Sequence, residues 1–180
     1  TASLDEDTEA DITLTFSDPD VKPADTLTVQ FSTLPNYGTL IYNNAVVSGN
    51  TKINVGTARS LVVKYKPFHN YNGKDFFSFY VVDAGNARSS SANVDITVIP
   101  VNDPPRATVA NPVAGAEDQW NPITLMVDDI DKDGLQIKFD WDYLNGTLCL
   151  VNATGLGASD DCPKDSIIEK GKWYPATFSP

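Results

Sequence analysis

The sequence predicts an all-β protein of the β-sandwich class, built from two copies of one kind of domain. Three observations lead to this prediction. Short runs alternate apolar with polar residues, clusters of Asp, Asn, Gly and Pro separate these runs, and a set of motifs occurs twice in the same order. Alternation with a period of two is typical of a strand with one buried face, and no segment of the 180 residues shows a sustained helical period.

The expected strands follow from the alternation in chain order. Ile12, Leu14 and Phe16 alternate with threonines, and the next run alternates in the same way around Val29. The expected strands are residues 12–16, 27–31, 61–65, 76–82 and 94–98, with a further short run at 106–110. Residues 43–56 and 84–91 carry a weaker pattern, so we expect loops or weak edge strands there.

The internal repeat defines the domains. Glu6-Asp7-Thr8 returns as Glu117-Asp118-Gln119, and Ile12-Thr13-Leu14 returns as Ile123-Thr124-Leu125 at the same offset. We therefore expect a first sandwich at residues 1–101 whose first strand is largely missing, and a linker at 102–105. The second sandwich, at 106–180, is expected to be incomplete and to stop before its last two strands. The linker, Asn-Asp-Pro-Pro, is expected to be stiff, because each proline fixes φ and lacks a backbone N–H.

Composition limits the possible partners. The net charge is −11, and the acidic residues are 20 Asp and only 4 Glu. This charge argues against nucleic acid and against anionic membrane surfaces, because no basic stripe exists to neutralise phosphates. No apolar run reaches the ~20 residues of a membrane span, and no signal peptide opens the sequence. Asp and Asn are oxygen ligands for cations and also common turn residues, so the Asp excess suggests cation binding without requiring it.

Several spaced motifs together resemble a known family. They are Glu-Asp-Thr, Ser-Asp-Pro-Asp, Pro-Asn-Tyr-Gly-Thr-Leu, Tyr-Lys-Pro, Asn-Tyr-Asn-Gly-Lys-Asp-Phe-Phe, Val-Val-Asp and Pro-Val-Asn-Asp-Pro-Pro, in this order. This order resembles the tandem-95 type of cadherin-like repeat, closely over residues 5–105 and more loosely over 106–175. The resemblance implies tandem immunoglobulin/cadherin-like β-sandwich domains in a large extracellular protein, and calcium-stiffened adhesion or structural stalks rather than catalysis. The second copy departs from the pattern through a cysteine pair and through Asp128-Asp129-Ile130-Asp131, which lacks the usual proline.

Calcium is the expected cofactor. The turns of an immunoglobulin-like sandwich alternate between its two poles, so several acidic turns are expected at the same pole. Acidic turns of both domains and the linker should then converge at one joint and supply the six to eight oxygens that calcium takes. The predicted interdomain ligands are Glu6, Asp75, Asn102, Asp103, Asp129 and Asp131, and a second set, Asp18, Asp20 and Asp83, is expected at the opposite pole. The alternative is that these acids are turn formers and caps in solvent. Asp131-Lys132-Asp133-Gly134 is not an EF-hand, since the bidentate Glu and the flanking helices are missing.

Two further features point to the outside of the cell. Cys149 and Cys162 are the only cysteines, and they are expected either to form one disulfide or to remain two free thiols. Asn145 and Asn152 begin glycosylation sequons, so we expect N-glycans there. The remaining expected partners are neighbouring repeats of the same array and other copies in a filament.

No catalytic set is apparent in the sequence. His69 is the only histidine, and a lone histidine in a loop is more often a surface residue than a base or a ligand. The sequence therefore predicts a non-enzymatic, extracellular structural or adhesive module, part of a stalk, an adhesin or a filament. The alternative is a carbohydrate-binding module that uses exposed Trp120 or Trp173, while Trp141 between two aspartates is expected to be buried.

Overall fold

The computed structural model describes residues 1–18, 26–109, 123–140, 147–148 and 168–175. The described residues are organised in strands, turns and irregular segments, and no helix occurs among them. None of these described segments contains a helix that could span a membrane. The contacts divide the chain into two units, Thr1–Val101 and Asn102–Pro180.

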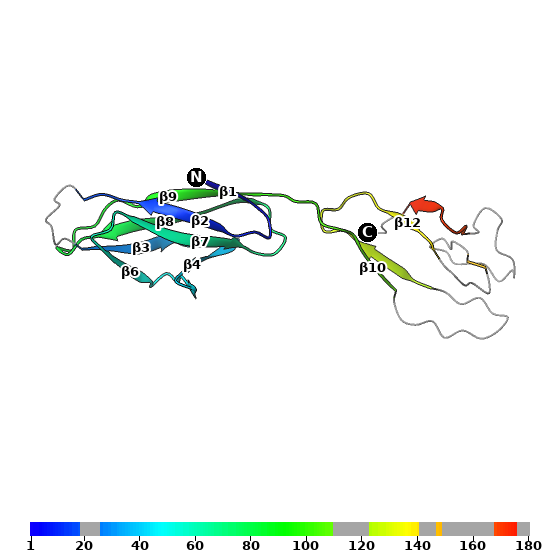
Figure 1. Ribbon diagram of the computed structural model, residues 1–180, viewed down its shortest axis with the longest axis horizontal. Helices are drawn as coiled ribbons and strands as arrows, with labels where there is room; N and C mark the ends of the chain where they lie inside the picture. Colours follow the sequence, from blue (N-terminus) through cyan, green and yellow to red (C-terminus); the bar gives the residue numbers. More distant parts are fainter. Residues whose placement is uncertain (19–25, 110–122, 141–146, 149–167, 176–180) are drawn as a thin grey trace. The chain divides into compact units, whose positions relative to one another are not determined.

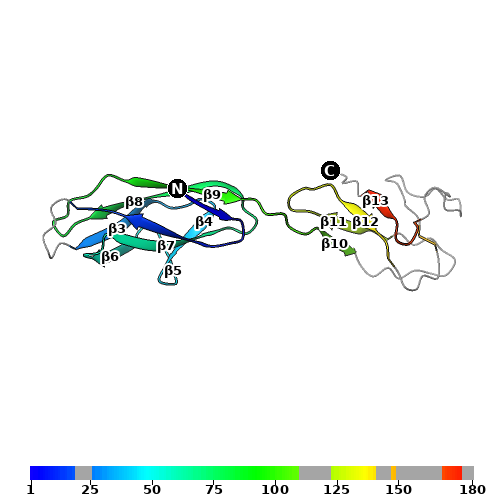
Figure 2. The same ribbon diagram turned by 45° about the horizontal axis from the view of Figure 1, so that its top comes forward.

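The first unit is a sandwich of two sheets (Figures 1 and 2). A five-stranded sheet has the order β1-β9-β8-β3-β6, and a four-stranded sheet has the order β2-β7-β4-β5. The strands are β1 Ala2–Asp5, β2 Ala10–Thr15, β3 Leu27–Thr33, β4 Gly38–Tyr42, β5 Ala45–Val46, β6 Lys52–Gly56, β7 Ser60–Pro67, β8 Gly73–Val82 and β9 Ala92–Ile99. All pairings in this unit are antiparallel except that β1 runs parallel to β9.

The core confirms the all-β sandwich fold that the alternation predicts. In β3, Leu27, Val29 and Phe31 are buried, while the residues between them are partly exposed. The same period of two appears in β2 and β7, so each strand turns one row of apolar side chains toward the facing sheet. The buried cluster is Leu4, Ile12, Leu14, Val29, Phe31, Leu40, Val47, Ile53, Leu61, Val63, Tyr65, Phe77, Phe79, Val81, Ile96 and Val98.

The edges of the sandwich differ from the sequence prediction in two places. Residues 2–5 form β1, although the first strand of this domain was expected to be largely missing; a single buried side chain, Leu4, fixes its inward face. β8 begins at Gly73, so Asp75 lies inside a strand and not in the turn before it. The weak segment 43–56 contains two short edge strands, β5 and β6, as the sequence pattern suggests.

The second unit contributes two small antiparallel sheets among its described residues. β10 Arg106–Val109 pairs with β11 Leu125–Asp128, and β12 Gln136–Lys138 pairs with β13 Trp173–Pro175. Ile168 is buried, and Phe139 meets Tyr174 edge-on with ring centroids 6.1 Å apart. The described part of the second unit is therefore all-β, and in it β11 is followed by the acidic turn at residues 129–133.

Candidate metal-binding acids

The pole of the first unit where β9 ends collects four segments. They are the β1–β2 turn at residues 6–9, the β3–β4 turn at 34–37, the β7–β8 turn at 68–72, and residues 100–101. Glu6 and the β7–β8 turn therefore lie at one pole, as the alternation of turns predicts. Asp75, two residues inside β8, lies just beneath them.

Glu6 is a buried carboxylate that ties the β1–β2 turn to the chain after β9. Its side chain is on the inward parity set by Leu4, and the residue is only 4% exposed. Oε1 accepts a hydrogen bond from the Val101 backbone N–H at 2.6 Å, and Oε2 accepts a longer one from Asn72 Nδ2 at 3.4 Å. The Glu6 backbone N–H also donates to Ile99 O at 2.9 Å, so both ends of this residue hold the end of β9.

Asp75 has a structural role that the sequence prediction missed. Its carboxylate is 5% exposed and accepts four hydrogen bonds, two on each oxygen. Oδ1 accepts the backbone N–H groups of Asn36 (3.0 Å) and Phe76 (2.9 Å). Oδ2 accepts the N–H of Tyr37 (3.0 Å) and the Tyr65 hydroxyl (2.9 Å). Four donors satisfy the lone pairs of a buried carboxylate, so we leave Asp75 out of any metal-ligand set.

The partner tyrosine belongs to the facing sheet, and therefore this network joins the two layers. Tyr65 is fully buried in β7, and burial raises the pKa of its phenol well above the ordinary value, with the Asp75 carboxylate adding to the rise. The hydroxyl thus stays protonated and acts as a donor. Gly38 of β4 packs against the same ring: a Cβ at this position would come within 2.5 Å of Tyr65 Cε2 and 2.7 Å of Lys66 O.

Asp7 uses its carboxylate to hold the β7–β8 turn. Oδ1 accepts the Asn70 backbone N–H at 3.0 Å and lies 2.8 Å from His69 Nδ1. The N–H of Asn70, and then the His69 contact, hold the pKa of Asp7 below its usual range. Asp7 itself adopts a left-handed backbone with φ of 58°. His69 is 83% exposed, which agrees with the surface position expected from the sequence.

In the second unit, hydrogen bonds connect four of the predicted ligands or their backbones, namely Asn102, Asp103, Asp129 and Asp131. Asp129 is buried (7% exposed), and its Oδ1 accepts the backbone N–H groups of Asp131 (2.9 Å) and Asp133 (3.5 Å), which shapes the turn after β11. Asp131 Oδ2 accepts the backbone N–H of Asp103 at 2.7 Å. Asn102 Nδ2 donates to Asp103 O at 3.2 Å. The other oxygen of the Asp129 and Asp131 carboxylates accepts no hydrogen bond from a described residue.

The remaining predicted ligands are placed differently. Asp83 lies at the opposite pole of the first unit, where its Oδ1 accepts the Ala87 N–H at 2.7 Å and closes a turn; Asp18 lies at the same pole and is partly buried. Outside the described residues lies one predicted ligand, Asp20. The same holds for the predicted glycosylation sites Asn145 and Asn152, the cysteines Cys149 and Cys162, and the tryptophans Trp120 and Trp141. Within the described segments, no group of three or more His, Cys, Asp or Glu side chains is arranged to hold a metal ion.

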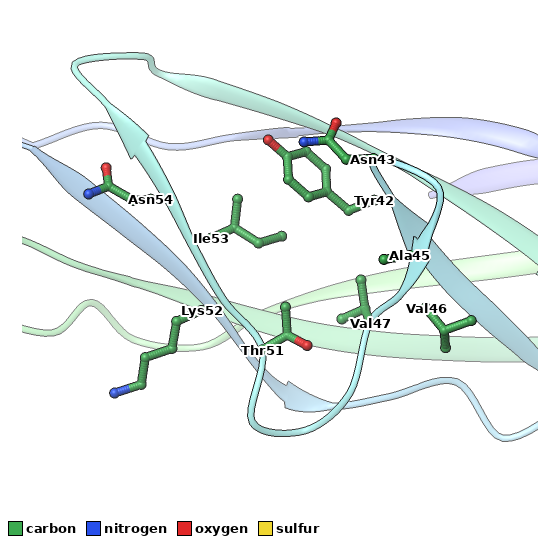
Figure 3. A pocket seen from close by; sticks show the side chains of 9 residues that line it. All are labelled: Tyr42, Asn43, Ala45, Val46, Val47, Thr51, Lys52, Ile53 and Asn54. Atoms are coloured by element: carbon green, nitrogen blue, oxygen red, sulfur yellow. The ribbon is translucent and has the colours of Figure 1, made fainter.

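A shallow groove opens between the β5 hairpin and β6 (Figure 3). It measures about 400 Å³ and is lined by Tyr42, Asn43, Ala45, Val46, Val47, Thr51, Lys52, Ile53 and Asn54. Tyr42 and Ile53 project into this space, whereas Lys52 extends away from it. Its lining contains no carboxylate, histidine or cysteine.

The alternative of a carbohydrate-binding module depends on exposed tryptophans, and of these Trp173 lies within the described residues. It is the first residue of β13 and is 59% exposed. Lys138 Nζ of the paired strand lies over the ring, 5.8 Å from its centroid, so one face of the indole has a cationic neighbour.

The comparisons with known proteins concern the first unit. A sequence model of the family described as "Bacterial Ig domain" matches residues 1–97, which span β1 to most of β9. A comparison with curated proteins gave no match. Domains of the matched family are commonly found on the cell surface or outside the cell.

Proposed function

The chain belongs to the bacterial Ig domain family, and from this premise we propose that it is a non-enzymatic extracellular repeat module of a surface stalk, adhesin or filament. The observation that carries the proposal is the path of the chain through the first unit. β1 and β9 run parallel and side by side, so the chain enters and leaves this sandwich in one direction. Such a path suits domains that are joined head to tail, as the tandem motifs and their resemblance to cadherin-like repeats suggest.

The stalk proposal is tested on the native assembly. Electron microscopy of the material isolated from cell surfaces should reveal beaded rods in which sandwiches follow one another. A preparation that contains only separate, unassociated single chains would contradict the filament form of the proposal, and a catalytic activity that follows the purified chain would contradict the non-enzymatic form.

We further propose that calcium binds at the acidic turn of the second unit and stiffens the chain there. The donor set has the right chemistry, because carboxylate and backbone or amide oxygens are the ligands that calcium prefers. Asp131 already contacts Asp103, Asp129 shapes the same turn, and each of the Asp129 and Asp131 carboxylates keeps one oxygen without a described donor. Calcium would draw the Asp129 and Asp131 carboxylates closer, since without it like charges repel.

The calcium proposal can be tested by melting the chain in calcium, in magnesium and in chelator. Tryptophan emission reports on the second unit, because all three tryptophans lie beyond residue 101. Calcium at about 100 times its dissociation constant should stabilise the bound state by about 2.7 kcal/mol, and Asp131→Asn should remove most of this gain. Asp95→Asn, an exposed change on β9, is the matched control and should keep the full effect. Equal melting temperatures in calcium and chelator, with no heat of binding, would contradict the proposal.

A second candidate function is carbohydrate recognition, and the exposure of Trp173 favours it. An exposed indole face stacks on sugar rings, and such sites need one or more accessible aromatic side chains. Binding on a glycan array that Trp173→Ala or Trp120→Ala abolishes would favour recognition over a passive stalk. Glycans at Asn145 and Asn152 and a Cys149–Cys162 disulfide stay predictions from the sequence, to be measured by intact mass before and after deglycosylation and reduction.

A further inference from the structure

We propose that Asn72 is a site of spontaneous deamidation, and that the product weakens the hydrogen bond between Glu6 and the Val101 backbone N–H that follows β9. Asn72 is the last residue of the turn before β8, Gly73 is the first residue of β8, and both are exposed. Gly73 has a φ of 131°, a backbone conformation that residues with a side chain rarely adopt, and its nitrogen carries no neighbouring Cβ to shield it. The proposal rests on these residues alone and is independent of calcium binding.

The side chain of Asn72 is loosely held. Among the described residues its carboxamide makes one hydrogen bond, from Nδ2 to Glu6 Oε2, and this bond is long at 3.4 Å. Other turn-forming polar side chains of the unit are held more tightly: Asn54 Oδ1 accepts the Gly56 N–H at 2.8 Å, and Asp83 Oδ1 accepts the Ala87 N–H at 2.7 Å. A loosely held carboxamide can turn toward the backbone nitrogen that follows it.

The reaction needs only water. The Gly73 backbone nitrogen attacks Asn72 Cγ and loses its proton, the N–Cγ bond forms, and the Cγ–Nδ2 bond breaks as ammonia leaves. The resulting five-membered succinimide then takes up one water at either ring carbonyl and opens to an aspartate or an isoaspartate. Asparagine is among the thermally labile residues for this reason. No oxidant, reductant or metal takes part.

The product changes the surroundings of Glu6. A donor amide 3.4 Å from a buried carboxylate is replaced by a second carboxylate. Like charges at this distance repel, and the repulsion is strong because Glu6 is almost excluded from water. Glu6 Oε1 also holds the Val101 N–H, at 2.6 Å, where β9 has ended. Deamidation at residue 72 is therefore expected to loosen the attachment of Val101 to the β1–β2 turn.

The chain contains its own control for the chemistry. Asn70 lies two residues earlier and is followed by Tyr71, whose backbone nitrogen already donates to Phe68 O at 3.1 Å. A tryptic peptide of residues 65–74 contains both asparagines, because trypsin does not cut between Lys66 and Pro67. Peptide mapping also separates this site from Asn145–Gly146, the other Asn-Gly dipeptide of the sequence.

The experiment incubates the full chain at neutral pH and 37 °C, digests it at mildly acidic pH and maps peptide 65–74 by mass spectrometry over time. The expected result is accumulation of aspartate and isoaspartate at residue 72 and an unchanged Asn70. In parallel, Asn72→Asp should melt at a lower temperature than wild type and should speed hydrogen exchange of the Val101 amide by about tenfold, whereas Asn72→Gln should do neither.

Two results would overturn the proposal. The first is an intact Asn72 in the folded chain after an incubation in which the same chain, unfolded in urea, becomes deamidated there. The second is Val101 exchange that is the same in Asn72→Asp and wild type, because the coupling through Glu6 would then be absent. Faster deamidation of Asn70 than of Asn72 would also overturn the proposal, for the same reason as the first result.

Discussion

The substitution Asp75→Ala tests most directly how much the buried hydrogen bonds of the Asp75 carboxylate stabilise the first unit. The change removes a buried acceptor that serves four donors: the N–H groups of Asn36, Tyr37 and Phe76, and the Tyr65 hydroxyl. Removing one partner of a buried charged network costs about 3–5 kcal/mol of unfolding free energy, because the remaining groups lose their partner and cannot reach water. For a domain of this size that is a fall in Tm of roughly 12–40 °C.

The assay combines urea unfolding, followed by circular dichroism, with two partner variants. Tyr65→Phe removes one donor and leaves three on Asp75, so it should cost about 1–2 kcal/mol. In the Asp75→Ala background the same Tyr65→Phe change should cost much less, since its partner is already gone; the difference is the coupling free energy of the pair. Asp95→Ala, an exposed change on the neighbouring strand, is the control and should stay within about 0.5 kcal/mol of wild type. A cost below about 1 kcal/mol for Asp75→Ala, or strict additivity with Tyr65→Phe, would refute the reasoning.

Three further predictions concern the same unit. Gly38→Ala should cost about 2–3 kcal/mol in urea unfolding, because its Cβ would meet Tyr65 Cε2 at 2.5 Å; an unchanged midpoint would mean that the ring moves aside freely. Asp7 has a lowered pKa, so its contribution to stability is complete above pH 4 and is lost as the pH falls through the folded pKa; the Tm difference between wild type and Asp7→Asn should therefore shrink in acid, and a constant difference from pH 2 to 6 would contradict this. Glu9→Gln, which removes an exposed partner of Lys64 and Lys66, should leave the urea unfolding midpoint nearly unchanged, and a loss of stability that is larger in 1 M salt than in low salt would contradict this expectation.

Much of the first unit was predictable, because its strands are amphipathic. The spacing of Leu27, Val29 and Phe31 alone predicts β3, because a strand with one buried face has apolar residues at every second position. β1 was not predicted as a strand, since Leu4 is its one buried apolar side chain and four residues are too few to show a period. Its partner, β9, is also distant in the sequence, and pairing over that distance leaves no local signal.

The role of Asp75 was missed although the sequence contained a sign of it. Asp75 has the same parity as Phe77, Phe79 and Val81 of β8, so its side chain had to point into the core. A carboxylate on the inward face of a strand needs donors, which indicates a structural network before it indicates a metal site. Which donors serve it could not be read from the chain, because they come from the β3–β4 turn and from the facing sheet.

The acidic turn of the second unit was located correctly by the order of strands and turns, since it follows β11 as expected. Its hydrogen bonds were beyond sequence reasoning. That Asp129 would bond the N–H groups of its own turn, and that Asp131 would bond Asp103, depends on backbone dihedrals such as the φ of 62° at Lys132.

The parallel pairing of β1 with β9 has a mechanical consequence. A pull on the N-terminal side of β1 and on the C-terminal side of β9 drags the two strands past each other along their length. The hydrogen bonds between Ala2–Asp5 and residues 96–99, together with the Glu6 contacts that follow them, are then loaded in shear and must break together. A sheet that was instead pulled open like a zipper would lose one bond at a time at lower force. The parallel pairing of β1 and β9 therefore lets the first unit resist tension applied between its two ends.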